Sequence, residues 1–227
     1  MVREVILCES PLEKAYVLDD SYLGPYLDSV RQQNYDGRAR AILENVCGIN
    51  GEFAGAHPFG LVHLQNSSLL PPNTRLATGR DLEVLISRDR DFLGKNSVNF
   101  GISLKTVEDS HMLNKPLSSR LFDQLRQKGM HLSNGKSHGK LIDFRALKLE
   151  ENPESSYGLV FNLNGNLGSI QDLGSLQWDF VREGLSTAYR TEKGCYSDGW
   201  YLAESVQGSR VVVVQENRPS VANLEES

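Results

Sequence analysis

Hydrophobic and polar residues alternate most regularly along residues 97–107 (SVNFGISLKTV). A period of two is typical of a β-strand, because successive side chains point to opposite faces of a sheet. The apolar set is Val98, Phe100, Ile102 and Leu104. The pattern predicts a strand that buries this set and leaves Asn99 and Ser103 more exposed.

A helical period follows in residues 116–128, where Leu117, Leu121 and Leu125 lie four positions apart. Asn114 is a candidate N-cap, and Gly129 can adopt the left-handed conformation that ends a helix. Two more helices are predicted from residues that favour a helix start. Ser10-Pro11 predicts one over 11–18, and Gly24-Pro25 predicts one that runs to about residue 35.

The remaining apolar runs are short and lie between turn residues, which favours strands. Strands are predicted at residues 3–8, 38–46, 61–65, 82–88, 141–149 and 157–163. Segments 199–205 and 210–215 predict a hairpin. Residues 176–190 leave two alternatives open, a helix interrupted at Gly184 or two strands that turn there.

These elements predict an α+β fold, a mainly antiparallel, strand-rich single domain with a few short helices. Strands and helices do not alternate regularly, which argues against a doubly wound parallel sheet. We expect the domain to span residues 1–218. Residues 219–227 are polar and without a period, so we expect a disordered tail there.

Composition indicates the cellular compartment that we expect for the protein. No apolar run approaches the roughly 20 residues of a membrane helix, and Glu4 and Glu9 interrupt the region where a secretory signal would be apolar. The three cysteines are widely spaced and form no CxxC motif, which argues against a disulfide framework or a zinc site. We therefore expect a cytoplasmic protein with no membrane contact and no cofactor.

The charge is distributed unevenly along the chain. Residues 115–148 carry eight basic and two acidic side chains, whereas the whole chain has a net charge of −5. Clustered positive charge is typical of proteins that bind phosphate or an acidic partner. The predicted nucleic-acid-binding residues are Lys115, Arg120, Lys136, His138, Lys140 and Arg145.

Motifs for catalysis or metal binding are weak. Gly135-Lys136-Ser137 resembles the end of a phosphate-binding loop, but the glycine required five positions before Gly135 is replaced by Met130. His57 and His63 lie six positions apart without the further ligands that a metal site needs. Cys195 lies in a glycine-flanked turn, and no motif supplies a base for it.

The leading hypothesis is a non-catalytic binding or assembly subunit of a nucleoprotein complex. Its partners would be other protein subunits and RNA or DNA, contacted through the basic segment. Small accessory subunits of ribonucleoprotein machines, including CRISPR-type antiviral complexes, have this general character. The comparison is an analogy between kinds of protein and rests on no shared motif. The alternatives are a small intracellular hydrolase or transferase that uses histidine and carboxylate groups, and a structural oligomer subunit.

Overall fold

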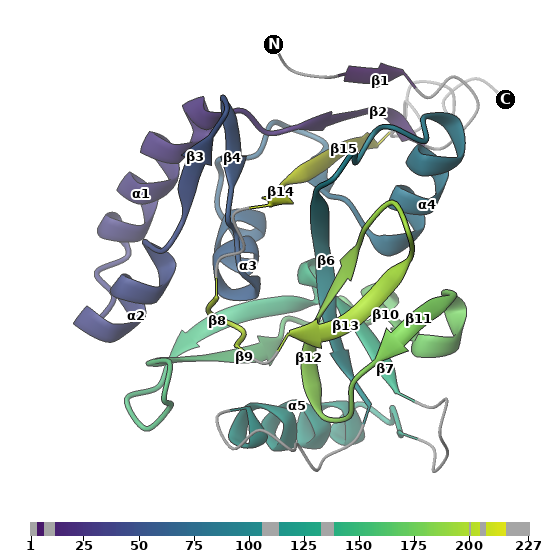
Figure 1. Cartoon of the computed structure of the whole chain (residues 1–227). Coiled ribbons are helices and arrows are strands. Elements are labelled where there is room, and N and C mark those ends of the chain that lie inside the picture. Colours follow the sequence, from purple (N-terminus) through teal and green to yellow (C-terminus); the bar gives the residue numbers. More distant parts are fainter. Residues whose placement is uncertain are drawn as a thin grey trace, which may run out of the picture.

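A computed structural model of the chain describes residues 4–6, 12–105, 114–132, 139–199, 201–204 and 208–216. The fold is α+β with mainly antiparallel sheets, as the sequence predicts (Figure 1). The helices are α1 (Leu23–Gln32), α2 (Gly37–Leu43), α3 (Pro58–Asn66), α4 (Gly79–Arg88) and α5 (Lys115–Gln127). Short 3-10 turns are η1 (Asp20–Tyr22), η2 (Phe144–Ala146), η3 (Leu167–Ser169) and η4 (Leu173–Ser175).

A four-stranded antiparallel sheet joins sequence-distant parts of the chain. Its order is β1 (Glu4–Ile6), β2 (Leu12–Val17), β15 (Val212–Glu216) and β5 (Thr74–Leu76). The pairs match Val213 with Tyr16 on one side and with Leu76 on the other. The C-terminal strand β15 therefore lies inside this sheet, between two strands from the first third of the chain.

The larger sheet contains nine strands (Figure 1). Its main path is β11 (Trp178–Val181), β13 (Cys195–Gly199), β12 (Leu185–Arg190), β6 (Ser97–Leu104), β14 (Ser209–Arg210), β4 (Glu52–Ala54) and β3 (Cys47–Ile49). β7 (Lys140–Asp143) pairs with the C-terminal half of β6, and β10 (Ile170–Asp172) pairs with β7. A separate ribbon consists of β8 (Leu147–Glu151) and β9 (Leu159–Leu163).

Strand β6 confirms the alternation signal but corrects one expectation drawn from it. Phe100, Ile102 and Leu104 are buried, and Asn99 is half-buried. Ser103 is also fully buried and bonds to Ser197, so the expectation that it is exposed is wrong. A register shift against β12 interrupts the period of two, and β6 contributes to two separate hydrophobic clusters. The strand is therefore covered by packed side chains on both faces beyond the shift.

Other predicted elements are confirmed. α1 and α5 form where the sequence predicts them, and Gly129 has a φ of 73° at the end of α5. Asn114 is the N-cap residue of α5, although its side chain makes no capping hydrogen bond there. Residues 176–190 contain two strands, β11 and β12, with Gly184 at φ 85° between them, but each strand pairs with β13 and not with the other.

Several predicted elements are wrong. The expected helix over 11–18 is strand β2, and the expected strands over 38–46, 61–65 and 82–88 are helices α2, α3 and α4. The predicted strand 141–149 is divided by η2 into β7 and β8. Residues 201–204 form a turn, and β15 pairs with β2 and β5, so the expected C-terminal hairpin is absent from the described residues. The expected tail, 219–227, lies outside the described residues.

Candidate functional site

Three of the basic residues in the segment predicted to bind nucleic acid, Arg120, Lys140 and Arg145, are paired with carboxylates. The Arg120 guanidinium donates to Asn162 Oδ1 at 2.8 Å and lies 3.4 Å from Glu150. Lys140 pairs with Asp172 at 2.6 Å. These partners reduce the positive charge that the segment presents to a phosphate backbone.

The other predicted binding residues differ in position. Lys115 is exposed at the first residue of α5, and the structure gives it no ion pair among the described residues. Lys136 and His138 lie outside the described residues. Arg145 belongs to a different environment, a partly buried network of charged groups.

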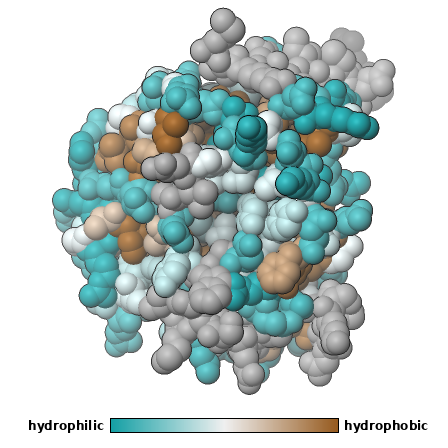
Figure 2. All heavy atoms as spheres, viewed as in Figure 1, coloured by the Kyte–Doolittle hydropathy of each residue, from teal (hydrophilic) through white to brown (hydrophobic). Residues whose placement is uncertain are grey.

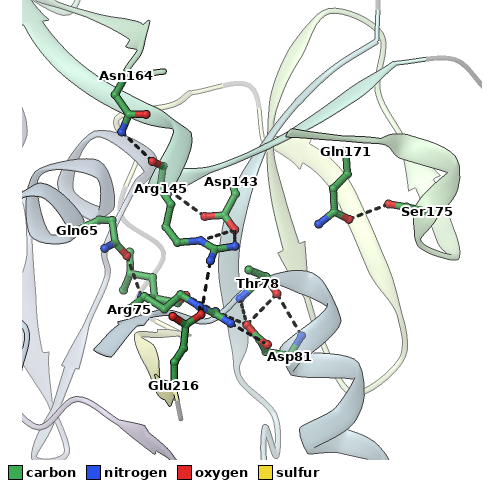
Figure 3. A network of polar contacts seen from close by, with 11 residues as sticks. Gln65, Arg75, Thr78, Asp81, Asp143, Arg145, Asn164, Gln171, Ser175 and Glu216 are labelled. Carbon is green, nitrogen blue, oxygen red and sulfur yellow. Dashed lines mark hydrogen bonds and ion pairs between the residues drawn. The ribbon is translucent and has the colours of Figure 1, made fainter. Parts of the chain in front are cut away.

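That network joins β5, α4, β7, η2 and β15 (Figure 3). Arg75 Nη2 donates to Asp81 Oδ1 at 3.2 Å, and Arg75 also contacts Glu216. Arg145 bonds Asp143 Oδ2 through Nη2 at 2.9 Å and Nε at 3.1 Å. Arg145 Nη1 lies 3.7 Å from Glu216, which connects the two arginines.

The electrostatics of the network fit a structural role. Burial alone would raise the pKa of Asp81, but hydrogen bonds and charge from Arg75, together with Thr78, hold it below its usual value. Burial raises the pKa of Asp143, and Arg145 only partly offsets it. Each carboxylate already has an arginine partner. We therefore expect the network to fix the two sheets rather than to bind a ligand.

His57 is also a structural group. It is fully buried at the N-cap of α3, where Nδ1 accepts from the Gly60 N–H at 3.2 Å. Nε2 lies 2.8 Å from the Ile42 carbonyl and must donate to it. Burial lowers the pKa of His57 to about 4, with the Ile42 bond opposing the shift. Both ring nitrogens are therefore committed to the backbone.

His63 lies near the other end of the same helix and borders a cleft. This His63 cleft has a volume of about 710 Å³ and lies between α1, α3 and β8. Its polar lining includes hydroxyl, amide, imidazole and ammonium groups: Ser29, Gln32, Gln33, His63, Asn66, Ser67, Ser68 and Lys148. Tyr35 and Leu69 add apolar surface. Small-molecule sites are usually clefts with a mainly apolar wall and a few convergent polar groups, and this cleft is more polar than that.

Ser29 and His63 form the central contact of the cleft. Ser29 Oγ lies 2.7 Å from His63 Nε2 and also donates to the Tyr26 carbonyl at 2.8 Å. The hydroxyl has one proton, so both bonds exist together only when Nε2–H is the donor to Oγ. The roles reverse only when the imidazole proton is on Nδ1 and the hydroxyl proton turns from the Tyr26 carbonyl toward Nε2. The direction of this hydrogen bond therefore depends on the imidazole tautomer.

The surroundings of His63 fix its ring and keep it neutral. Tyr26 and Tyr35 pack edge-on against it, with ring centroids 5.3 Å and 6.1 Å away. Burial lowers the pKa of His63 to about 4. The imidazole is therefore uncharged at neutral pH and has one nitrogen able to accept a proton.

Lys148 supplies a cation at the edge of the cleft. It is exposed on β8, and no carboxylate among the described residues forms an ion pair with it. Asn66 ties its strand to α3, because Nδ2 donates to the Leu147 carbonyl at 2.9 Å and to the Val62 carbonyl at 2.8 Å. The ammonium therefore stays close to the helix that carries His63.

Neither Cys195 nor the potential metal ligands of the described residues add a second site of this kind. Cys195 is fully buried in β13, and burial raises the pKa of its thiol to about 11, which makes it a poor nucleophile. Within the described ranges, no group of three His, Cys, Asp or Glu side chains could hold a metal ion. None of the described helices has both the length and the apolar character to cross a bilayer.

Sequence reasoning missed this cleft. His63 was expected on a strand as an isolated structural histidine, and Ser29 and Lys148 had no assigned role as ligands. The three residues lie 34 and 85 positions apart along the chain and share no local motif. Only the packing of α1 and β8 against α3 brings them together.

Comparison with known proteins gives no match: no protein-family model, no curated protein and no solved structure is similar to this chain.

Proposed function

We propose that the protein binds a small, hydroxylated, negatively charged molecule in the His63 cleft and that the Ser29–His63 pair moves a proton on it. The observation that carries this proposal is the 2.7 Å contact between Ser29 Oγ and His63 Nε2 on the wall of a 710 Å³ cleft. The proposal corresponds to the enzyme alternative of the sequence analysis, a hydrolase or transferase.

The lining of the cleft supports this ligand class. Gln32, Gln33 and Ser68 offer neutral donors and acceptors that suit hydroxyl groups. The Lys148 ammonium suits a phosphate or carboxylate group on the same molecule. Asp28 also borders the cleft, but Arg31 pairs with it at 3.1 Å and reduces its repulsion of an anion.

The neutral imidazole supports proton transfer. When the imidazole proton is on Nδ1, His63 Nε2 can accept the Ser29 proton, and the oxygen becomes more nucleophilic. A positioned general base typically contributes about 10²- to 10⁴-fold to a reaction rate, and a pKa of about 4 makes His63 a weaker base at neutral pH than an imidazole with its usual pKa. The tyrosines packed against the ring hold it in place, so little reorganisation is needed for the transfer.

A ligand panel tests the proposal. Thermal-shift and calorimetric measurements would compare sugar phosphates, hydroxy acids and uncharged sugars. We expect at least one anionic member to bind, Lys148→Met to weaken its affinity at least tenfold, and His63→Gln to weaken it further. The matched control is Lys128→Met, an exposed lysine beyond α5. No binding by any member, or equal binding by Lys148→Met and wild type, would overturn the proposal.

Nucleic-acid binding through the basic segment, membership in a nucleoprotein or antiviral complex and a cytoplasmic location stay predictions. Lys115 and Lys136 are the better residues for testing the first, by the salt dependence of RNA and DNA binding. Arg145→Ala is unsuitable, because removing Arg145 would leave the buried Asp143 carboxylate without its arginine partner.

A further inference from the structure

A second surface, separate from the His63 cleft, is formed by two tyrosines on adjacent strands. Tyr189 on β12 and Tyr196 on β13 are directly opposite each other in the antiparallel register. Their rings stack with centroids 5.6 Å apart and an interplanar angle of 19°. Both are half-buried. We call this pair the tyrosine platform.

The local backbone explains why these side chains face outward. Cys195 and Ser197, on either side of Tyr196, are fully buried, so the alternation of β13 directs Tyr196 away from the core. The register of β12 against β6 shifts between Ala188 and Tyr189, and such bulges re-aim side chains. Tyr189 also bonds Asp198, which together with burial raises the pKa of its hydroxyl.

Two hollows of opposite charge flank Tyr189. The first, about 500 Å³, is lined by both platform tyrosines and by Lys95 and Lys193. The second, about 200 Å³, is lined by Tyr189, Asp198 and Glu204. Tyr189 is the residue common to both. Tyr189 therefore borders both a hollow with basic side chains and a hollow with acidic side chains.

The lysines of the first hollow are available to a ligand. Both are exposed, and within the described parts of the chain neither lies in an ion pair. Glu192 also lines this hollow, but it forms no ion pair with either lysine. The molecular face in Figure 2 is mainly hydrophilic, with its apolar surface divided into small separate areas. Among the described residues, the two exposed large hydrophobic side chains are Phe180, which is paired with Tyr196, and Tyr201, which lines the second hollow.

A cross-strand tyrosine pair can serve only to stabilise a sheet. That role explains the stacking, but it does not explain the two lysines beside the rings, which have no ion pair among the described residues, or the carboxylates of the second hollow. A ligand with a flat ring, an anionic group and amino hydrogens would use all three features at once. A nucleotide unit has this combination.

We propose that the tyrosine platform binds a nucleotide unit, with the base stacked on a tyrosine ring and the phosphate beside Lys95 and Lys193. Aromatic stacking with neighbouring positive charge is how proteins bind single-stranded nucleic acid. Asp198 and Glu204 can accept hydrogen bonds from an amino group on the base, as carboxylates do from cytosine. The platform therefore favours cytosine over uracil. The site shares no lining residue with the His63 cleft and does not depend on the function proposed there.

The test uses the full chain and fluorescence anisotropy at low salt. The probes are labelled oligocytidine and oligouridine of about ten nucleotides, with CMP as a competitor. We expect oligocytidine to bind more tightly than oligouridine, and Tyr196→Ala to weaken it about tenfold or more. Tyr196→Phe keeps the ring and should bind nearly as wild type. Tyr22→Ala is the matched control, because Tyr22 is also half-buried, belongs to η1 and lines neither hollow.

The arms of the experiment separate the sources of the nucleotide. Competition by CMP supports a free nucleotide as ligand, and binding of oligonucleotide without such competition supports a single strand. The double variant Lys95→Met/Lys193→Met should reduce the salt dependence of single-strand binding by about 0.7 for each lost contact. Absence of binding by every probe, or unchanged binding by a folded Tyr196→Ala variant, would overturn the proposal. Equal binding of the two oligonucleotides would overturn the role of the carboxylates.

Discussion

His57 caps helix α3 and His63 lies within it, yet the two side chains have different hydrogen-bond partners. Both are buried, with exposed fractions of 0% and 6%, and in both cases burial lowers the pKa to about 4. His57 gives both ring nitrogens to the backbone. His63 bonds to the Ser29 side chain and borders an open cleft.

The comparison shows that burial and a shifted pKa do not by themselves identify a functional histidine. The pKa is lowered both in His57, which caps a helix, and in His63, which can accept a proton. The two histidines differ because His63 borders a cleft and bonds to the Ser29 hydroxyl, whose proton can change position. The four predictions below test this difference, beginning with the largest effect.

His57→Ala should destabilise the protein by about 2–5 kcal/mol, because it leaves the Ile42 carbonyl and the Gly60 N–H without partners in the core. His63→Ala should cost only about 1–2 kcal/mol, since Ser29 keeps its bond to Tyr26. Urea unfolding monitored by circular dichroism measures both. Equal losses would contradict the distinction between the two sites.

Acid should weaken the fold through both histidines. Their folded pKa of about 4 lies below the unfolded value of about 6.5, so the neutral form stabilises the folded state. That stability is fully present above pH 6.5 and is lost as the pH falls toward 4, by about 3 kcal/mol per histidine. Urea unfolding at several pH values, compared between wild type and His63→Gln, isolates one contribution. An unchanged pH dependence in the variant would contradict the assigned shift.

Ser29→Ala should change stability by less than about 1 kcal/mol, because its hydrogen bonds are only partly buried. Ser87→Ala is the matched control, since Ser87 makes the same bond to the carbonyl three residues earlier, at 2.7 Å, without a histidine. NMR titration of His63 should respond to Ser29→Ala and ignore Ser87→Ala. A His63 resonance that ignores both would show that the serine contact is not formed in solution.

Lys148→Met should leave the free energy of unfolding within about 0.5 kcal/mol of wild type, because the exposed ammonium has no ion pair to lose. Its effect should appear only when an anionic ligand is present. Thermal melting with and without ligand measures the two states. A large loss of stability without ligand would show that Lys148 has a structural role, as His57 has.

The elements that sequence predicted correctly have a clear period or a clear end. α5 repeats leucine every four positions before Gly129, and β6 alternates over its first half. In α3 every residue from Pro58 to Leu64 is buried, so no polar face reveals the helical period. α4 did carry a signal, because Thr78 and Asp81 form a capping box before the apolar residues. Its apolar run was read as a strand instead.

The error at the N-terminus had the opposite cause. The Ser10-Pro11-x-Glu13 pattern suits a helix start, but Ala15 and Val17 alternate with more exposed residues and face the core. Pairing with β15 decides the conformation, and β15 lies about 200 positions away. The candidate sites were hidden for the same reason. Neither the contact between Ser29 and His63 nor the hollow that joins Lys95 to Tyr196 has a signature in any short segment.

The position of β15 has a consequence for how the protein is made. A ribosome releases the chain from its N-terminus, so β2 and β5 emerge long before Val212–Glu216. Until then these two early strands lack the partner that both of them require, and their edges stay open to other chains. The four-stranded sheet is thus completed only after Val212–Glu216 has left the ribosome. Interrupted synthesis would leave an aggregation-prone nascent chain, and during that interval we expect the protein to depend most on chaperones.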